Sequence, residues 1–529
     1  MDIRIFKARL TRHKRTLMHC AIGLMLGAAA AACSLEEHTR SQITEEKAYA
    51  TRSGLFLNTV STLYNYIGSN VDGQGLQGMG RCVYDLQTFS SDEAIMPTRG
   101  GDWFDGGMWV EMFRHTWTPD HEIINNSWLY LYKVITLCNY SLNVLATHRT
   151  QAGDDYQAWT AEIRTLRAMY YWYLLDLYGD VPLVTTTQSS MYDVESTPRS
   201  QVFDFCVSEL TESLPLLAPH NSVSLGDYYG RMTQGVCLFV LAKLMLNAKV
   251  YTGTPRWQEC IDYCDAIESM GYWLTTSYAE NFSVQNEYSS ENIFTIPSDK
   301  HLFSNLQQNH TRSMHYRHAA AWGFSGENGT SATRKVLQVN AYGTDSVDRR
   351  FFDNYFADTI RDANDVVVTD RIGNPLIYHA EQIDLDLSGT PYVETGGARM
   401  KKYIFDRIAS KDGKLMDNDI VLFRFADVLL MRAEAKLRLG QDGQDDYDLV
   451  RSRAMMPLRP LTLHNLLDER LLELCWEGWR RQDLIRFGQF RTLDNSPSAI
   501  DESDGHTCIF PIPASARNMN PKLRQNKGY

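Results

Sequence analysis

Apolar residues recur at intervals of three and four along several long stretches of this chain. Ile163, Leu166, Tyr170, Leu174 and Leu177 would share one face of a helix, and Gly179 and Pro182 follow as a helix end. The same period predicts further helices over 202–214, 231–250, 257–269, 419–439 and 465–478. Paired helices from distant parts of the chain indicate a helical-repeat frame, although the sequence has no strict repeat period.

Two other stretches lack this period. Residues 271–415 are rich in Gly, Ser, Asn, Asp and Tyr, with short apolar runs such as Ile293–Ile296 and Val366–Val368, and 68–120 has similar character. Their composition predicts loops and short strands that are inserted into the helical frame. We therefore expect a mainly α fold, with a helical frame over about 41–67, 121–270 and 416–490 and loop-rich insertions over about 68–120 and 271–415.

The N-terminus has the pattern of a secretory signal. Six basic residues and one acid occupy positions 1–16, and an apolar run from Leu17 to Ala32 ends in alanines directly before Cys33. A cysteine directly after small residues resembles a bacterial lipoprotein signal, in which that cysteine is lipidated. We expect residues 1–32 to be removed, 33–40 to form a lipidated tether and 41–529 to form one domain. A plain signal peptide with an incidental cysteine is the alternative, and a membrane-spanning helix is disfavoured because the run is short.

Charge and cysteine content narrow the classes of function. The chain carries 52 basic and 64 acidic residues, and losing the basic signal makes it still more acidic, so nucleic acid is not an expected partner. The cysteines show no disulfide framework. Cys260 and Cys264 lie one helical turn apart without further metal ligands nearby. No hydrolase, phosphate-binding or dinucleotide motif occurs, and we expect no cofactor, no metal and no catalytic residue.

Four segments together resemble the SusD/RagB family of outer-membrane lipoproteins. They are 161–183 with its ending Tyr-Gly-Asp-Val-Pro-Leu, 421–435, 468–486 with Asp-Glu-Arg and Glu-Gly-Trp-Arg-Arg-Gln-Asp-Leu-Ile-Arg, and 510–529 with Phe-Pro-Ile-Pro and a final Gln-Asn-Lys-Gly-Tyr. The resemblance spans essentially the whole mature chain. Physically, we interpret the charged residues of these motifs as ion pairs between neighbouring helices: Glu469, Arg470, Glu473, Glu477, Arg480, Arg481 and Asp483.

The resemblance implies a single α-helical domain with a tetratricopeptide-like scaffold and a loop-rich part that carries the ligand. Members of the family are not enzymes. They capture glycans or, in the RagB branch, peptides, at the cell exterior. They act with a SusC-like TonB-dependent outer-membrane transporter, and the lipid holds them to the membrane.

The two loop-rich insertions supply the chemistry that binds a sugar, which needs an aromatic plate for its apolar face and polar groups for its hydroxyls. The first insertion offers Trp103 and Trp109 among glycines, with Arg99 and Asp102, and Asp92 precedes them. The second offers Tyr316, Trp322, Phe324 and Asn328. We expect the two loops to converge on one face, with the indoles of Trp103 and Trp322 forming an arc for a glycan chain.

Each of these residues also has a structural interpretation. The tryptophans could cap the helical core, and Asp92 and Glu93 could cap a loop. Peptide capture on the same scaffold remains an alternative, although aromatic loops favour glycan. A glycoside hydrolase using Asp102 and Asp105 is the least favoured interpretation, because such a pair needs a raised pKa and a defined separation.

Overall fold

The computed structural model describes residues 44–68, 74–77, 80–187, 193–219, 226–301, 308–362, 364–406, 408, 416–490 and 505–529, without the side chains of 46, 308 and 309. The predicted signal, Cys33 and the tether lie outside these residues. The chain divides into two units, 1–50 and 51–529. In the first unit the described part contains one short helix, α2 (Glu45–Ala48). The second unit contains the other described helices and strands.

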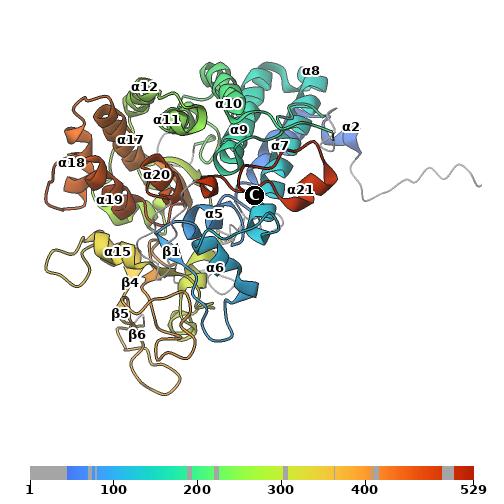
Figure 1. Cartoon of the computed structure of the whole chain (residues 1–529). Coiled ribbons are helices and arrows are strands. Elements are labelled where there is room, and N and C mark those ends of the chain that lie inside the picture. Colours follow the sequence, from blue (N-terminus) through green and yellow to red (C-terminus); the bar gives the residue numbers. More distant parts are fainter. Residues whose placement is uncertain are drawn as a thin grey trace, which may run out of the picture. The chain divides into compact units, whose positions relative to one another are not determined.

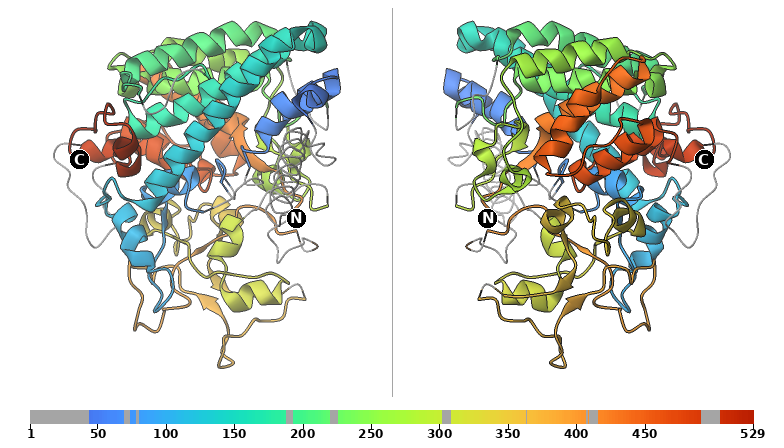
Figure 2. Two further views of the ribbon diagram at one scale, coloured as in Figure 1. Left: turned by 90° about the vertical axis from the view of Figure 1, so that its right-hand side faces the viewer. Right: turned by 90° about the vertical axis from the view of Figure 1, so that its left-hand side faces the viewer.

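Long helices form the frame of the second unit and pack in succession (Figures 1 and 2). α7 packs against α9, α9 against α10, α11 against α12, α12 against α17 and α17 against α18. This serial packing is that of a helical-repeat scaffold, and the prediction of a mainly α fold is confirmed. The helices are α7 (Glu122–Thr147), α9 (Tyr156–Tyr178), α10 (Arg199–Ser213), α11 (Gln234–Thr252), α12 (Trp257–Ser269), α17 (Phe425–Arg438), α18 (Gln444–Arg453), α19 (Leu463–Leu474) and α20 (Arg480–Arg486).

Shorter helical turns connect these elements. They are α3 (Arg52–Phe56), a π-turn (Leu57–Ser61), α4 (Thr62–Tyr64), α5 (Val83–Phe89), α6 (Met108–Phe113), α8 (Arg149–Ala152), α13 (Gln308–Ser313), α14 (Tyr316–Ala321), α15 (Arg334–Val339), α16 (Arg350–Asn354) and α21 (Ala514–Met519). Single 3-10 turns occur at Asp105–Gly107, Gly153–Asp155, Leu214–Leu216, Tyr278–Phe282, Asn286–Tyr288 and His506–Cys508.

Local signals set the helix limits. Thr233 begins α11 by accepting a hydrogen bond from the Val236 backbone on its side chain, and Gly253 ends that helix in the left-handed region. Gly179, with a φ of 72°, ends α9 as its position in the sequence predicts. α11 is, among the described residues, the one helix long and apolar enough to cross a membrane. However, 83% of its most apolar window is buried, and it packs against α12, α10 and α17 as a core helix.

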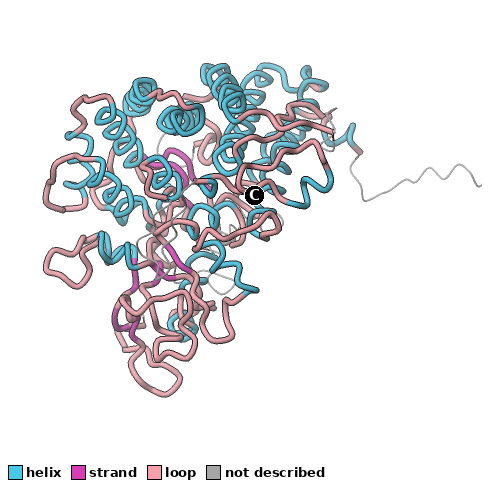
Figure 3. The backbone as a smooth tube through the Cα atoms, in the orientation of Figure 1, coloured by secondary structure: helices cyan, strands magenta, loops and turns pink. Residues whose placement is uncertain are grey.

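Strands are short and lie mostly in the loop-rich part (Figure 3). Across the described residues they form four two-stranded antiparallel sheets. The pairs are β1 (Ala94–Ile95) with β3 (Ser331–Ala332), β2 (Asn292–Ile296) with β8 (Ile420–Arg424), β4 (Tyr355–Phe356) with β7 (Arg399–Met400), and β5 (Asp358–Thr359) with β6 (Ile377–Tyr378).

Two predicted helix boundaries are wrong. The helix expected over 419–439 begins only at Phe425, because Ile420–Arg424 is a fully buried strand paired with β2. An uninterrupted apolar run of this length does not distinguish a buried strand from a buried helix. The helix expected over 465–478 ends at Leu474, since Trp476 and Gly478 both adopt positive φ.

Buried ion pairs join the frame to the insertions, and the prediction that the motif charges pair between elements is confirmed. Arg424, at the end of β8, bonds Glu473 at 2.6 Å, Glu477 at 2.8 Å and Glu291 at 3.3 Å. The neighbouring guanidinium groups of Arg453, Arg424 and Arg350 hold the pKa of the Glu473 carboxyl far below its usual range, against the opposing effect of burial. The Glu473 carboxylate therefore stays charged and paired in the interior.

Candidate functional site

The loop after β1 is held beside residues 327–331 by a short sheet. β1 pairs with β3 in the register Ala94 to Ala332 and Ile95 to Ser331. Beyond the strand the chain makes a tight turn, in which the backbones of Arg99 and Asp102 exchange hydrogen bonds of 2.9 and 3.2 Å. Gly100 in this turn has a φ of 68°, which glycine adopts at little cost. The turn presents Asp102 and the residues after it at the surface.

Trp103 connects this loop to the second insertion. Its indole N–H donates to the carbonyl of Glu327 at 2.8 Å. The six-membered ring lies so close to Gly329 that a Cβ there would come within 2.6 Å of it. The Trp103 side chain is half-buried. The two predicted loops therefore meet.

A chain of polar contacts continues across the same surface. The Tyr316 hydroxyl donates to Asp102 Oδ2 at 2.6 Å, and Arg371 lies over the Tyr316 ring at 5.9 Å. Arg371 also lies 3.5 Å from the Glu394 carboxylate, whose other oxygen accepts from His315 Nε2 at 3.1 Å. We call Asp102, Trp103, Phe104, Tyr316, Arg371 and Glu394 the Asp102–Tyr316 surface.

Burial and neighbouring charges set the protonation states of Tyr316 and His315. Partial burial raises the pKa of Tyr316 to about 12, and the hydrogen bond and charge of Asp102 act in the same direction. The phenol therefore stays protonated and donates. Burial also lowers the pKa of His315, so its ring is neutral, with Nε2 as donor to Glu394 and Nδ1 as acceptor from the Arg317 backbone.

Arg99 is buried and holds the segment 393–396, which carries Glu394. Its guanidinium donates to the carbonyls of Val393 at 3.0 Å and Gly396 at 2.9 Å, and to Ser331 Oγ at 2.8 Å. Burial holds its pKa well below the usual value, and the charge of Arg399 adds to this effect. Arg99 thereby positions the segment that carries Glu394, which corrects its predicted role as a polar contact.

Four further predicted contact residues are also buried, and a buried side chain offers no surface to a glycan. Trp109 is only 1% exposed, donates to Asp105 Oδ2 at 2.9 Å and packs on Phe89. Asp92 forms a two-bond ion pair with Arg480. Phe324 stacks on Phe405 at 5.5 Å, and Asn328 is buried as well. The structure corrects all four from ligand contacts to structural residues.

Trp322 lies at the edge of a separate aromatic cluster. Its indole N–H donates to the carbonyl of Arg361 at 2.8 Å, and its ring is 5.4 Å from both Phe356 and Phe405. It is half-buried. The N–H groups of both predicted indoles thus donate to backbone carbonyls of the protein. Only the exposed part of each ring is open to a ligand.

Three residues of the surface were not predicted from the sequence. Phe104 is 58% exposed and is the outward aromatic of the first loop, while its neighbour Trp103 turns inward. Arg371, 64% exposed, and Glu394 come from segments without any motif. The run Trp103-Phe104 among glycines was a signal for Phe104, but no pattern in the sequence pointed to the other two.

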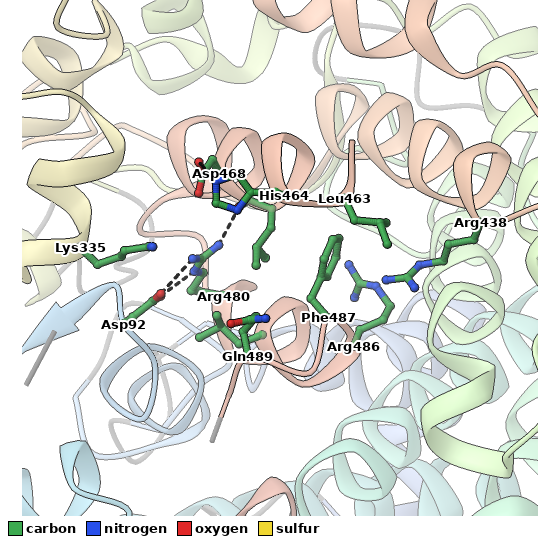
Figure 4. A pocket seen from close by; sticks show the side chains of 12 residues that line it. Asp92, Lys335, Arg438, Leu463, His464, Asp468, Arg480, Arg486, Phe487 and Gln489 are labelled. Carbon is green, nitrogen blue, oxygen red and sulfur yellow. Dashed lines mark hydrogen bonds and ion pairs between the residues drawn. The ribbon is translucent and has the colours of Figure 1, made fainter. Parts of the chain in front are cut away.

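A separate pocket of about 440 Å³ lies between α19 and α20, with Lys335 of α15 at one end and Arg438 of α17 at the other (Figure 4). Figure 4 shows the Arg480 guanidinium directed at the Asp92 carboxylate. Arg486 is likewise paired with Glu434. Because its charged groups largely satisfy each other, this pocket is a weaker candidate than the Asp102–Tyr316 surface.

No group of three or more His, Cys, Asp or Glu side chains in the described part of the chain could hold a metal ion. The eight described cysteines form no disulfide, and Cys260 and Cys264 lie on α12. Asp102 and Asp105, the pair considered for hydrolysis, already accept hydrogen bonds from Tyr316 and from Trp109.

Comparison with known proteins identifies the scaffold. One family model, described as "SusD family", matches residues 269–529, and a second, described as "Starch-binding associating with outer membrane", matches 83–246. The chain is 25% identical to the starch-binding protein SusD of Bacteroides thetaiotaomicron, covering 87% of this chain and 88% of that protein. It is 24% identical to the SusD-like protein P25 of Formosa agariphila, covering 86% of each.

Solved structures show the same fold. The surface glycan-binding protein A of Bacteroides thetaiotaomicron, in complex with laminarihexaose, superposes with a TM-score of 0.69 at 19% identity, over 88% of this chain and 98% of that one. A laminarin-binding SusD-like protein superposes with a TM-score of 0.69 at 20% identity, over 92% of this chain and all of that one. With its helical frame and its family motifs in place from α9 to the C-terminus, this chain belongs to the SusD family.

Proposed function

We propose that this protein is a glycan-binding lipoprotein of the outer membrane that captures oligo- or polysaccharide and passes it to a TonB-dependent transporter. The observation that carries the proposal is the Asp102–Tyr316 surface. There the exposed ring of Phe104 lies two residues from the carboxylate of Asp102, which accepts a hydrogen bond from the Tyr316 phenol. The exposed guanidinium of Arg371 lies over the Tyr316 ring.

This arrangement suits sugars. An exposed aromatic ring covers the apolar face of a pyranose, and each Å² of apolar area covered contributes about 25 cal/mol. Asp102, Glu394 and Arg371, on the same surface, offer acceptors and donors to the hydroxyl groups of a sugar. The names of the relatives, which bind starch and laminarin, agree with this class of ligand.

The first test is titration calorimetry of the purified mature protein against starch, laminarin and a set of peptides, alongside an assay for released reducing sugar. We expect binding to at least one polysaccharide and no release of sugar. Binding to peptides alone would support peptide capture on the same scaffold. Release of reducing sugar from the bound glycan would show a hydrolase.

Anchoring and delivery need tests of their own, because Cys33 lies outside the described residues. Cys33→Ala should release the protein from membrane fractions or leave it unprocessed. Co-purification from solubilised membranes should recover a large TonB-dependent transporter with the wild-type protein. Recovery only as a monomer, under conditions where related pairs survive, would count against delivery.

A further inference from the structure

A second pair of aromatic rings faces solvent outside the Asp102–Tyr316 surface. All eleven tryptophans lie within the described residues, and Trp273, at 58%, is the one whose side chain is exposed. Tyr288 is 52% exposed. Among the described residues, neither the Trp273 indole nor the Tyr288 ring and hydroxyl has a hydrogen-bond, ring-stacking or cation partner. Both rings therefore present open faces together with free donor groups.

Hydrogen bonds bring the two segments together. The Trp273 backbone N–H donates to the carbonyl of Ser290 at 3.3 Å, and the Ser290 hydroxyl donates back to the carbonyl of Trp273 at 3.0 Å. Tyr288 is only two residues before Ser290, which limits its backbone to about 7 Å from this junction. The two rings thus arise from adjoining segments.

The base of this junction is rigid. Glu291 follows Ser290 and is fully buried, and it accepts hydrogen bonds from the Thr275 backbone at 3.1 Å and from the Asn281 amide at 2.9 Å. It also forms ion pairs with Arg453 and Arg424 of the buried network. A ligand that lay on these rings would therefore meet groups whose backbone is already ordered, which lowers the entropy lost on binding.

The pair is distinct from the surface described above. Trp273 follows α12 and Tyr288 precedes β2, whereas Tyr316 begins α14 and Arg371 lies between β5 and β6. Exposed polar residues accompany the two rings, among them Thr276, Ser277 and Gln285. Two rings in such surroundings cover far less than the roughly 800 Å² per partner that a stable protein interface buries.

We propose that Trp273 and Tyr288 form a second glycan-contacting surface, which engages a distant part of the same polysaccharide chain. The inference rests on the proposed function and extends it, because two separate contact surfaces favour long chains over short ones. Linking two weak contacts through one ligand raises the apparent affinity without any new contact at either surface.

The test compares the Trp273→Ala/Tyr288→Ala double variant with the wild type and with two controls, Phe104→Ala and Tyr140→Ala. Tyr140 is an exposed aromatic on α7. The ligands are laminarihexaose and laminarin, with maltohexaose and starch as the second pair. Calorimetry should show that the double variant binds the polysaccharide about tenfold more weakly or worse. Its affinity for the hexasaccharide should stay unchanged, and Tyr140→Ala should match the wild type for both.

A second readout reports on Trp273 directly. Acrylamide quenches the fluorescence of an exposed indole, so polysaccharide should protect the wild-type protein from quenching while the hexasaccharide protects it less. Trp273→Phe should lose that additional protection. If the wild type binds the polysaccharide but the double variant binds it equally well, the second surface is ruled out while the proposed function stands. If the wild type binds neither glycan pair, the proposed function fails first, and the inference fails with it.

Discussion

The hydroxyl of Tyr316 donates a 2.6 Å hydrogen bond to the carboxylate of Asp102, which lies 214 residues earlier in the chain. This bond joins the two loop-rich insertions at the surface, in addition to the contact of Trp103 with Gly329. It also fixes the orientation of a carboxylate that would otherwise rotate freely in solvent. The surface therefore depends on both insertions, and either one alone would leave it incomplete.

Removing this bond should weaken glycan binding more than folding. Tyr316→Phe keeps the ring but deletes the donor, so Asp102 loses the bond that orients it. We expect a loss of about 0.5–1.5 kcal/mol in binding free energy, the usual net value of one hydrogen bond. Titration calorimetry and thermal melts measure the two effects separately. Unchanged affinity for a glycan that the wild type binds would exclude Asp102 and Tyr316 from the contact surface.

Phe104 and Trp109 should respond in opposite ways to truncation, although they lie five residues apart. Phe104→Ala should weaken glycan binding by about 1–3 kcal/mol, the range for covering one large apolar side chain. Its effect on stability should stay within about 0.5 kcal/mol, because the ring faces solvent. Trp109→Ala should cost about 3–5 kcal/mol of unfolding free energy, because the indole is buried against Phe89.

Denaturant unfolding and calorimetry on both variants provide the measurement. Equal stability losses would contradict the assignment of Phe104 to the surface. A binding defect in Trp109→Ala at full stability would restore Trp109 as a ligand contact.

Most of the helical frame could be predicted from the sequence, because its information is local. The apolar stripe of α9 and the glycine that ends it lie within a few turns of each other. The prediction failed where distant partners decide the structure. Ile420–Arg424 is a strand because β2, more than 120 residues earlier, pairs with it.

The candidate site was predictable as a meeting of two loops but not residue by residue. Trp103 and Phe104 are adjacent and chemically alike, and the positive φ of Trp103 together with the carbonyl of Glu327 decides which one turns inward. Asp92 looked like a surface carboxylate because its partner, Arg480, lies 388 residues away. No local pattern encodes such a pairing.

That Asp92–Arg480 pair should be essential for stability. Arg480 Nε lies 2.6 Å from Asp92 Oδ1 and Nη2 lies 2.9 Å from Oδ2, with both side chains buried. Asp92→Asn or Arg480→Met leaves one charge buried without its partner, and we expect a loss of about 3–5 kcal/mol. Asp92→Leu/Arg480→Met, which removes both charges, should recover part of this loss.

A matched control is the more exposed pair Arg256–Glu259 at the N-terminus of α12. Arg256→Met should cost less than about 1 kcal/mol. Denaturant unfolding of the four variants gives the comparison. If the two single variants at the buried pair are as stable as the control, the Asp92–Arg480 pair contributes little to the free energy of unfolding.

Acid should destabilise the fold partly through His115. Its Nε2–H donates to the carbonyl of Ser90 at 2.7 Å, and its ring stacks on Phe490 at 4.3 Å. Burial lowers the pKa of His115 from 6.5 to about 4; the charge of Arg481 also lowers it, and the hydrogen bond to Ser90 opposes the shift. Between about pH 6.5 and 4 the unfolded chain therefore binds a proton that the folded chain does not, so stability falls as pH decreases through this interval.

The full effect of this group is on the order of 3 kcal/mol, from a shift of between two and three pKa units. His115→Gln removes the titrating ring, and its unfolding free energy, although lower at neutral pH, should fall less steeply than that of the wild type between pH 6.5 and 4. His464→Gln is the matched substitution control at a histidine whose side chain is 80% exposed. Urea unfolding at half-unit pH steps measures all three slopes. A slope for His115→Gln identical to the wild type would mean that the buried ring takes up its proton in the folded state as readily as in the unfolded chain, contrary to its stacked and buried position between Trp117 and Phe490.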